Sequence, residues 1–428
     1  MAQQLFFSRD TKVYIKKGNF VWDLPVLDGF SFSQATNSSE ITLAEMEGSG
    51  GVSRRGRKQF NDSLAPAEWS FSTYVRPFKS AGSGTGAADS AAKVHAIEEV
   101  LWALFSGPAT YASSAFTGQT VHDTTDLDID FSESNKATLG TADIFFVLGD
   151  ANRKVYKLKD CVVNEASLDF DIDGIATINW SGMSSEIIDM TLRTITQAAI
   201  PAFNAVVADT TVVSAPSASH PGGDVWLDSD DGHRLHTVLT VPSSGNTTVT
   251  ASIYESTTAT DNFIRNRLTQ LTVIPTAGTS YIGSLESAGY DITLTGGNIT
   301  MSNNVTFITP EEIGLVNTPI GHVTGTRSVS GSMNCYLSKD TTANDNSADL
   351  WEDLKAITST VTNSFALVFK IGGATSNTAR LEVNMPTCHL EIPTHSIEDV
   401  ISVETSFNAL PSTIDGTNEV TLKYFPKV

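Results

Sequence analysis

Trp69-Ser-Phe-Ser-Thr-Tyr-Val75 is the stretch that decides the fold, because bulky and small polar residues alternate along it. This alternation places Phe71, Thr73 and Val75 on one face and Ser70, Ser72 and Tyr74 on the other, which is the period of a β-strand. A stretch of the same character, Gly331-Ser-Met-Asn-Cys-Tyr-Leu337, lies much further along the chain. A strand that occurs twice indicates a repeated structural unit.

Four further segments recur in the same order around this strand. They are an alternating strand with a polar turn (27–37 and 294–304), a short helix (95–105 and 348–357), a hydrophobic strand (142–148 and 364–370) and a closing hairpin, in which Cys161 and Cys388 precede 166–172 and 400–407. Five landmarks in one order predict two tandem modules, residues 1–190 and 262–428. Each is expected to be a β-sandwich or barrel-forming sheet with one flanking α-helix, so the fold class is mainly β.

The segment between the two copies, residues 191–261, has a different composition. It is rich in Ser, Thr and Ala and contains several prolines, but alternating runs occur at 236–241 and 247–253. Alternation over such short runs is typical of strands, whereas the proline-rich remainder is typical of connections. We therefore predict a linker that carries a small β insertion.

The composition excludes several classes of protein. The 428 residues include 27 Lys and Arg against 48 Asp and Glu, a formal net charge of −21, which argues against a surface that grips nucleic-acid phosphates. The three cysteines lie far apart without metal-ligand spacing, so they are expected to be small buried side chains. No apolar run approaches the length of a membrane span, and no export or membrane segment is expected.

No motif of an enzyme, metal site or cofactor site stands out. Asp228-Ser-Asp-Asp-Gly232 is similar to the start of a calcium-binding loop, but Leu239 occupies the position where such loops carry a glutamate. Neither a nucleophile elbow nor a zinc-protease motif is present in the sequence. We therefore expect a protein that is not an enzyme, with no cofactor and no metal.

One long segment resembles a known family. Arg55-Gly-Arg-Lys-Gln-Phe-Asn-Asp-Ser-Leu-Ala-Pro-Ala-Glu-Trp-Ser-Phe-Ser-Thr-Tyr74 is similar to a segment of the tail tube proteins of T-five-like siphophages. The resemblance continues in order through residues 173–182, 297–310, 320–325 and 407–412, so it spans both copies of the repeat. The chain is thus identified as a candidate member of that family.

The resemblance implies an assembly and its partners. In that family, three chains with duplicated modules make a ring that imitates six single modules, and rings stack head to tail around a tape-measure protein. The implied function is a structural virion protein of the phage tail, the conduit for DNA ejection. Further implied partners are the chain itself, the tail terminator and the tail tip or baseplate proteins. Double-stranded DNA would pass without specific binding, and assembly would take place in the host bacterial cytoplasm without a membrane.

Two sets of charged residues are candidates for roles in such a tube. Acids on predicted strands could line the lumen and keep the DNA polyanion from adhering; the candidates are Glu40, Asp169, Asp171, Glu391 and Glu404. The basic run Arg54, Arg55, Arg57 and Lys58 lies in a long polar connection, where it could contact acids of the next ring. A solvated cluster that offsets nearby acids is the alternative for this run.

A different class of protein also fits the composition. Acidic, Ser/Thr-rich, strand-dominated chains are common among surface adhesins and carbohydrate-binding β-sandwiches. The order of the repeated landmarks favours the tube protein over this alternative.

Overall fold

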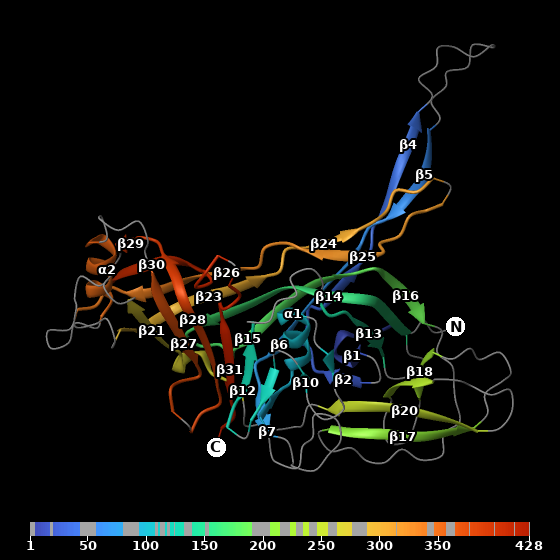
Figure 1. The fold of residues 1–428 in the computed structure, drawn as a ribbon, viewed down its shortest axis with the longest axis horizontal. Helices are drawn as coiled ribbons and strands as arrows, with labels where there is room; N and C mark the ends of the chain where they lie inside the picture. Colours follow the sequence, from blue (N-terminus) through green and yellow to red (C-terminus); the bar gives the residue numbers. More distant parts are fainter. Residues whose placement is uncertain are drawn as a thin grey trace.

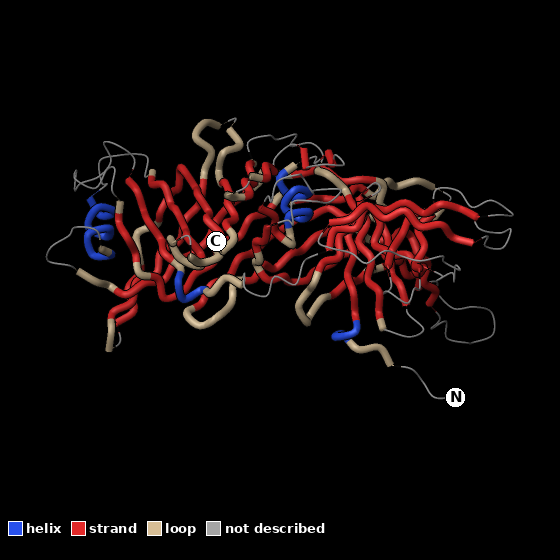
Figure 2. Tube along the Cα trace, turned by 90° about the horizontal axis from the view of Figure 1, so that it is seen from below, coloured by secondary structure: helices blue, strands red, loops and turns tan. Residues whose placement is uncertain are grey.

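The fold is seen in a computed structural model, in which strands make up most of the described chain (Figures 1 and 2). It describes residues 5–17, 20–42, 57–79, 94–107, 110–111, 116–117, 120–123, 125–131, 139–149, 154–190, 206–214, 223–227, 234–238, 246–255, 263–275, 289–313, 315–339, 346–356, 364–375, 377–397, 399–414 and 416–427. The fold class is mainly β, as predicted. None of the helices in these ranges is long and apolar enough to cross a membrane.

One continuous antiparallel sheet, which we call the long sheet, runs through both halves of the chain. Its strands follow in the order β3 (Ser31–Ser33), β6 (Ala67–Tyr74), β15 (Thr177–Ser184), the second half of β14 (Lys154–Asp171), β23 (Leu294–Ser302), β26 (Ser328–Tyr336), β30 (Ile401–Ala409) and β29 (Thr394–Ile397). The β14–β23 pairing joins the two halves, so four strands of each half form one surface.

Two further sheets cover the buried side of the long sheet. The first has the order β2 (Phe20–Leu24), β1 (Thr11–Lys17), β13 (Ala142–Leu148), the first half of β14, and β16 (Glu186–Met190). The second has the order β22 (Tyr290–Ile292), β21 (Gln270–Pro275), β27 (Phe365–Ile371), β28 (Arg380–Leu390), β31 (Thr421–Phe425), β12 (Leu127–Asp130) and β11 (Thr120–His122). Each half is therefore a two-layered β structure.

The strand pairings recur in the two halves. Strands β1, β2, β3, β6, β13, β15 and β16 of the first half pair in the same way as β21, β22, β23, β26, β27, β30 and β31 of the second. Cys161 pairs with Ala142 and Cys388 with Phe365, each beside a register shift, so the predicted match of the two cysteines agrees with these registers. The module boundaries at 190 and 262 remain predictions.

One predicted correspondence in the closing hairpin is wrong. The run 400–407 corresponds to β15 rather than to residues 166–172, because β30 pairs with β26 as β15 pairs with β6. Residues 166–172 lie in the preceding strand and at its end, and their counterparts follow Cys388. Both strands of an antiparallel hairpin alternate, so sequence periodicity could not distinguish them.

The first of the two helices in the described ranges is shorter than predicted, and the second is shifted by one residue. Helix α1 covers Glu99–Ser106 and α2 covers Ser347–Ala356. The predicted first helix began at His95, but Val94–Ala96 form β8, which pairs with β7 (Pro77–Lys79). A short buried run of apolar residues fits a strand as well as a helix, which explains the early start.

The remaining elements are hairpins and short turns. Strands β4 (Thr36–Thr42) and β5 (Arg57–Leu64) form a projecting arm above β24 (Val305–Ile308) and β25 (Gly321–Thr324) (Figure 1). In the middle segment, β17 (Val206–Ser214), β18 (Gly223–Leu227), β19 (Arg234–Val238) and β20 (Asn246–Glu255) pair with one another, and β20 also pairs with β2. The list is completed by β9 (Thr110–Tyr111), β10 (Phe116–Thr117), η1 (Ser8–Asp10) and η2 (Asn266–Leu268).

The hydrophobic core is continuous across the two halves. The indole rings of Trp102 and Trp180 lie 4.7 Å apart in the first half. Phe170 of the first half contacts Phe369 of the second, with ring centroids 5.6 Å apart, and Phe369 contacts Phe407. Since these rings are buried, the β14–β23 pairing lies above a shared aromatic core.

Candidate assembly surfaces

The outward face of the long sheet is a surface of small polar side chains. One row across it consists of Ser72, Asn179, Ser167, Thr300, Ser330 and Asn408, which are paired strand to strand. In the six inner strands, from β6 to β30, most side chains of the opposite face are buried in the core, because successive residues of a strand point to opposite sides. Among the described residues of the eight strands, no Lys or Arg lies on the polar face. We call this surface the polar face.

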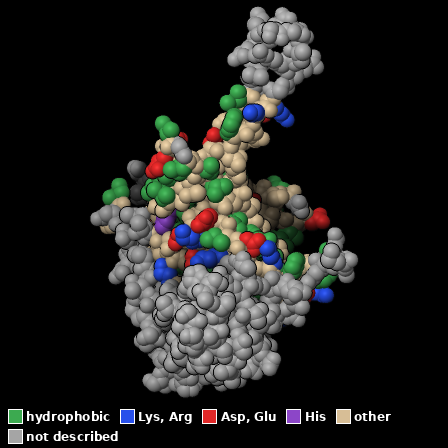
Figure 3. Space-filling model, turned by 90° about the vertical axis from the view of Figure 1, so that its right-hand side faces the viewer, with side chains coloured by type: hydrophobic (Ala, Val, Ile, Leu, Met, Phe, Trp, Pro, Cys, Tyr) green, Lys and Arg blue, Asp and Glu red, His purple; other side chains and the backbone are tan. Residues whose placement is uncertain are grey.

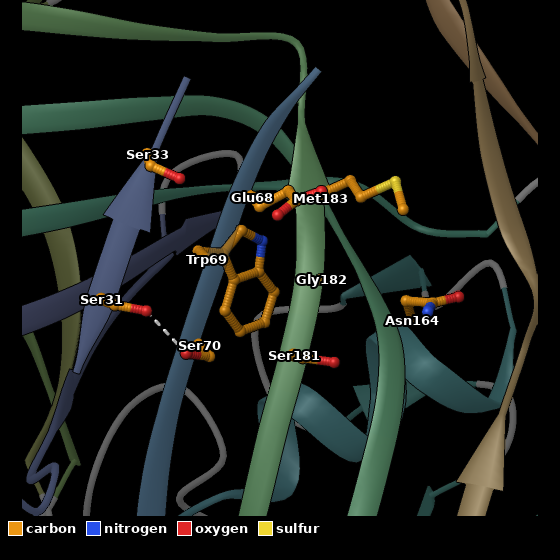
Figure 4. Close-up of a pocket in the computed structure, with 9 residues that line it drawn as sticks. All are labelled: Ser31, Ser33, Glu68, Trp69, Ser70, Asn164, Ser181, Gly182 and Met183. Carbon is orange, nitrogen blue, oxygen red and sulfur yellow. Dashed lines mark hydrogen bonds between the residues drawn. The ribbon is translucent and has the colours of Figure 1, made fainter. Parts of the chain in front are cut away.

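Hydrogen bonds between neighbouring strands hold many of these side chains in place. Ser72 Oγ donates to Asn179 Oδ1 at 2.6 Å, and Asn179 Nδ2 donates to Asp169 Oδ2 at 2.9 Å. At the β3 end, the hydroxyls of Ser31 and Ser70 lie 2.8 Å apart beside a shallow hollow of about 290 Å³ (Figure 4). Several polar side chains of this face therefore bind one another across neighbouring strands.

Three of the predicted lumen acids lie on the polar face, and two do not. Asp169 and Asp171 pair with Asn298 and Gly296, and Glu404 pairs with Asn334 and Thr394. Glu391 follows the end of β28, where its backbone N–H donates to the carbonyl of Ser406. The sequence reasoning missed Glu68 and Glu165, although the alternation of β6 already placed Glu68 with Ser70 and Ser72.

Glu40 lies on the arm and not on the long sheet. It belongs to β4, which pairs with β5, and its carboxylate is 3.3 Å from the guanidinium of Arg57. Arg57 and Lys58 begin β5 rather than lying in a loop, whereas Arg54 and Arg55 lie outside the described residues. Arg57 therefore has an exposed acid partner within its own arm.

Exposed apolar side chains gather on the arm and below it (Figure 3). Ile41 and Phe60 of the arm are about half exposed. Below them, β24, β25 and the segment between them expose further apolar residues, namely Ile308, Ile313, Leu315, Val316, Ile320 and Val323. The two parts touch, because the backbone N–H of Leu64 donates to the carbonyl of Asn317. Contiguous apolar exposure of this kind marks a surface that binds another protein.

A buried polar network joins the two halves behind the polar face. Tyr424 of β31 donates its hydroxyl hydrogen to Glu98 Oε1 at 2.9 Å and accepts a hydrogen bond from Trp102 Nε1 at 2.6 Å. Burial raises the pKa of Glu98 to about 7, although the Tyr424 hydrogen bond and Arg76 act in the opposite direction. Lys423, next along β31, pairs with Asp128 of β12 at 2.9 Å. The last strand of the chain is therefore held in the first half.

The three cysteines are buried thiols, and burial raises the pKa of each. The acidic turn at 228–232 lies outside the described residues. Within the described part of the chain, no group of three or more His, Cys, Asp or Glu side chains could hold a metal ion.

Comparison with known proteins identifies a relative over the full length of the chain. The chain is 26% identical to "Tail tube protein pb6" of Escherichia phage T5 over 434 residues, which covers 100% of this chain and 77% of the relative. No family model matches the chain. The fold and this full-length similarity define a structural protein of a phage virion. The chain is a T5-like tail tube protein, a component of the tail of a long-tailed phage.

Proposed function

We propose that three copies of this chain form a ring of six modules and that stacked rings form the conduit for DNA ejection. The observation that carries this proposal is the long sheet, in which each half contributes four strands to one continuous surface. Further copies added in the same way would continue this sheet around an axis. Closure of a sheet leaves no free edges, which removes the risk of uncontrolled strand pairing.

The polar face is the surface that would line the channel. Several of its hydroxyl and amide groups are hydrogen-bonded to one another, and its charged side chains include Glu68, Glu165, Asp169, Asp171 and Glu404. Duplex DNA is a dense polyanion, so a wall with acids and without described cations would neither bind nor retain it. Glu391 lies beside this face, and Glu40 lies too far along the arm to be included.

The arm is the surface that would contact the adjacent ring. It projects from the body and combines exposed apolar residues with Arg57 and Lys58 near the end of its described part (Figure 3). Arg54 and Arg55 precede these residues in sequence. A basic, partly apolar arm fits an acidic neighbour, and contacts that do not close along the axis produce a filament. The tape-measure, terminator and tip proteins are proposed partners of this filament.

Charge reversal on the polar face tests the proposed conduit. A triple variant with Asp169→Lys, Asp171→Lys and Glu404→Lys should assemble but eject DNA more slowly or incompletely, because the cations would bind phosphates. A matched triple reversal of exposed acids outside the long sheet and the arm, Asp10→Lys, Asp189→Lys and Glu352→Lys, should eject normally. Unchanged ejection by the first variant in correctly assembled tails would contradict the channel role of this face.

A further inference from the structure

The pairing between β14 and β23 is a junction between two similar units inside one chain. Seven residue pairs form it, from Glu165 opposite Ser302 to Asp171 opposite Gly296. At its centre Leu168 lies opposite Ile299, and both side chains are buried, with exposed fractions of 3% and 0%. The junction therefore covers apolar side chains on its inner side and carries polar ones on its outer side.

The two free ends of the long sheet carry the counterparts of these two strands. Strand β29 follows Cys388 as the second half of β14 follows Cys161. His395 lies opposite Val403 of β30 as Leu168 lies opposite Ile178 of β15. At the other end, Phe32 lies opposite Trp69 of β6 as Ile299 lies opposite Gly331 of β26. One edge strand of the long sheet, β29, therefore corresponds to β14, and the other, β3, corresponds to β23.

Exposure differs sharply between the junction and these ends. All four residues of β29 are exposed, and Ile397 is 80% exposed, whereas its counterpart Phe170 is 5% exposed. His395 occupies the position that corresponds to the buried Leu168, and its ring lies 5.4 Å from the indole ring of Trp351. An exposed strand edge with apolar residues is a site where another strand pairs.

We propose that β29 pairs antiparallel with β3 of a second copy of this chain, in the register of the β14–β23 junction. Transferred residue by residue, that register places Thr394 opposite Ser33, His395 opposite Phe32, Ser396 opposite Ser31 and Ile397 opposite Phe30 of the second copy. The inference rests on the proposed ring and specifies how its chains meet.

The chemistry of the paired residues fits this register. Ser31, Ser33, Thr394 and Ser396 would extend the polar face without interruption, because all four lie on its side of the sheet. Phe30 and Phe32 both contact the ring of Phe146, at 5.5 Å and 4.7 Å, so they form a fixed apolar surface at the β3 end. Ile397 and His395 would cover this surface as Phe170 and Leu168 cover their side of the junction.

Cysteine pairs test the register directly. The variant Ser31→Cys/Ser396→Cys, oxidised in assembled tubes or in tails from virions, should form disulfides between chains, because directly opposed residues bring their Cβ atoms within reach. The ladder of covalent oligomers on a denaturing gel should end at the number of chains in the ring. The matched control Ser31→Cys/Thr394→Cys is displaced by two residues and should cross-link at least about five-fold less. The native cysteines are buried and do not compete.

The outcomes separate the register from the proposed function. Tubes that form normally but cross-link preferentially through Ser31→Cys/Thr394→Cys, or through neither pair, would overturn the register and leave the tube intact. Failure of the unsubstituted chain to form hollow tubes would contradict the proposed ring itself. As a second test, Ile397→Asp should prevent ring closure, whereas Ile414→Asp, at a fully exposed isoleucine outside the sheet, should assemble. Normal assembly of the Ile397→Asp variant would contradict the proposed pairing of β29 with β3 of a second copy.

Discussion

In both halves of the molecule an aromatic ring packs over a glycine of the neighbouring strand, but the two residues exchange strands between the halves. In the first half, Trp69 of β6 lies over Gly182 of β15, which is its direct partner. In the second half, the glycine is in the strand that corresponds to β6, and Phe407 of β30 lies over Gly331. One aromatic ring lies over the glycine in both halves, but the ring comes from opposite strands of the pair.

This exchange teaches which features of the repeated unit are constrained. The total volume at a paired position is fixed by the close packing of the core, whereas the strand that supplies the side chain is not. Sequence identity between the halves can therefore be low even where their pairings are the same. The pattern of pairings is the more reliable sign of the repeat.

The largest effect on the free energy of unfolding is expected when either glycine is replaced. A Cβ atom at Gly182 would lie 2.1 Å from the carbonyl oxygen of Val162, and one at Gly331 would lie 2.1 Å from that of Asn298. Either change to alanine should lower the free energy of unfolding by about 3 kcal/mol. Denaturant unfolding measures it, with Gly321→Ala as the control, since nothing lies within 4 Å of its Cβ position. Equal stability of all three variants would show that the exchange is not a packing constraint.

A pH dependence of stability is expected next, because the first half buries the carboxyl group of Glu98, with a pKa of about 7, at the start of helix α1. The pKa of Glu98 is raised from 4.5 by burial, so the folded chain holds a proton that the unfolded chain releases. Stability should therefore fall as the pH rises from about 4.5 to about 7, by at most about 3 kcal/mol.

The variant Glu98→Gln isolates this contribution from those of other acids. Its unfolding free energy should vary less with pH over this window than that of the unsubstituted chain. Identical slopes for the two chains would mean that Glu98 titrates normally. Arg76, Glu99 and Tyr424 also influence Glu98, so the variant is compared only with the unsubstituted chain under the same conditions.

A smaller effect on stability is expected at Tyr424, which links the two halves. The change Tyr424→Phe removes the hydroxyl that bonds both Trp102 Nε1 and Glu98, which leaves two buried polar groups without this partner. The cost should be about 1 to 2 kcal/mol in thermal or denaturant unfolding. Tyr336→Phe is a matched control, because Tyr336 is 51% exposed. A cost as small as that of the control would contradict the role of Tyr424 in joining the halves.

The smallest effect is expected on the arm. The ion pair between Glu40 and Arg57 is exposed, so Glu40→Gln should change the free energy of unfolding by less than about 0.5 kcal/mol. Ejection should also be unaffected, since Glu40 does not lie on the polar face. A strong defect in ejection would return Glu40 to the set of channel acids.

The sequence predicted the repeated elements well because their alternation is strong. The strand around Trp69 has buried and partly exposed residues at the expected positions, and the two hydrophobic strands became β13 and β27. The two-residue period of a strand does not specify which strand it pairs with. This explains why residues 400–407 were matched with 166–172 rather than with β15. Partner choice depends on contacts between distant segments.

The candidate site was predicted less completely for the same reason. Asp169, Asp171 and Glu404 could be placed on one face of a sheet because they alternate with buried residues along their strands. Glu40 was grouped with these acids, but β4 pairs with β5 in the arm, and the local sequence does not specify that pairing. The junction of β14 with β23 has no local signal at all, because it joins segments more than 100 residues apart.

Electron cryomicroscopy of tail tubes made of this chain tests the central proposal most directly. We expect a hollow tube with three chains in each ring, in which the polar face, with the row from Ser72 to Asn408, lines the channel. A tube whose channel is lined by the β1–β13 or β21–β27 sheets would contradict the proposed role of the long sheet.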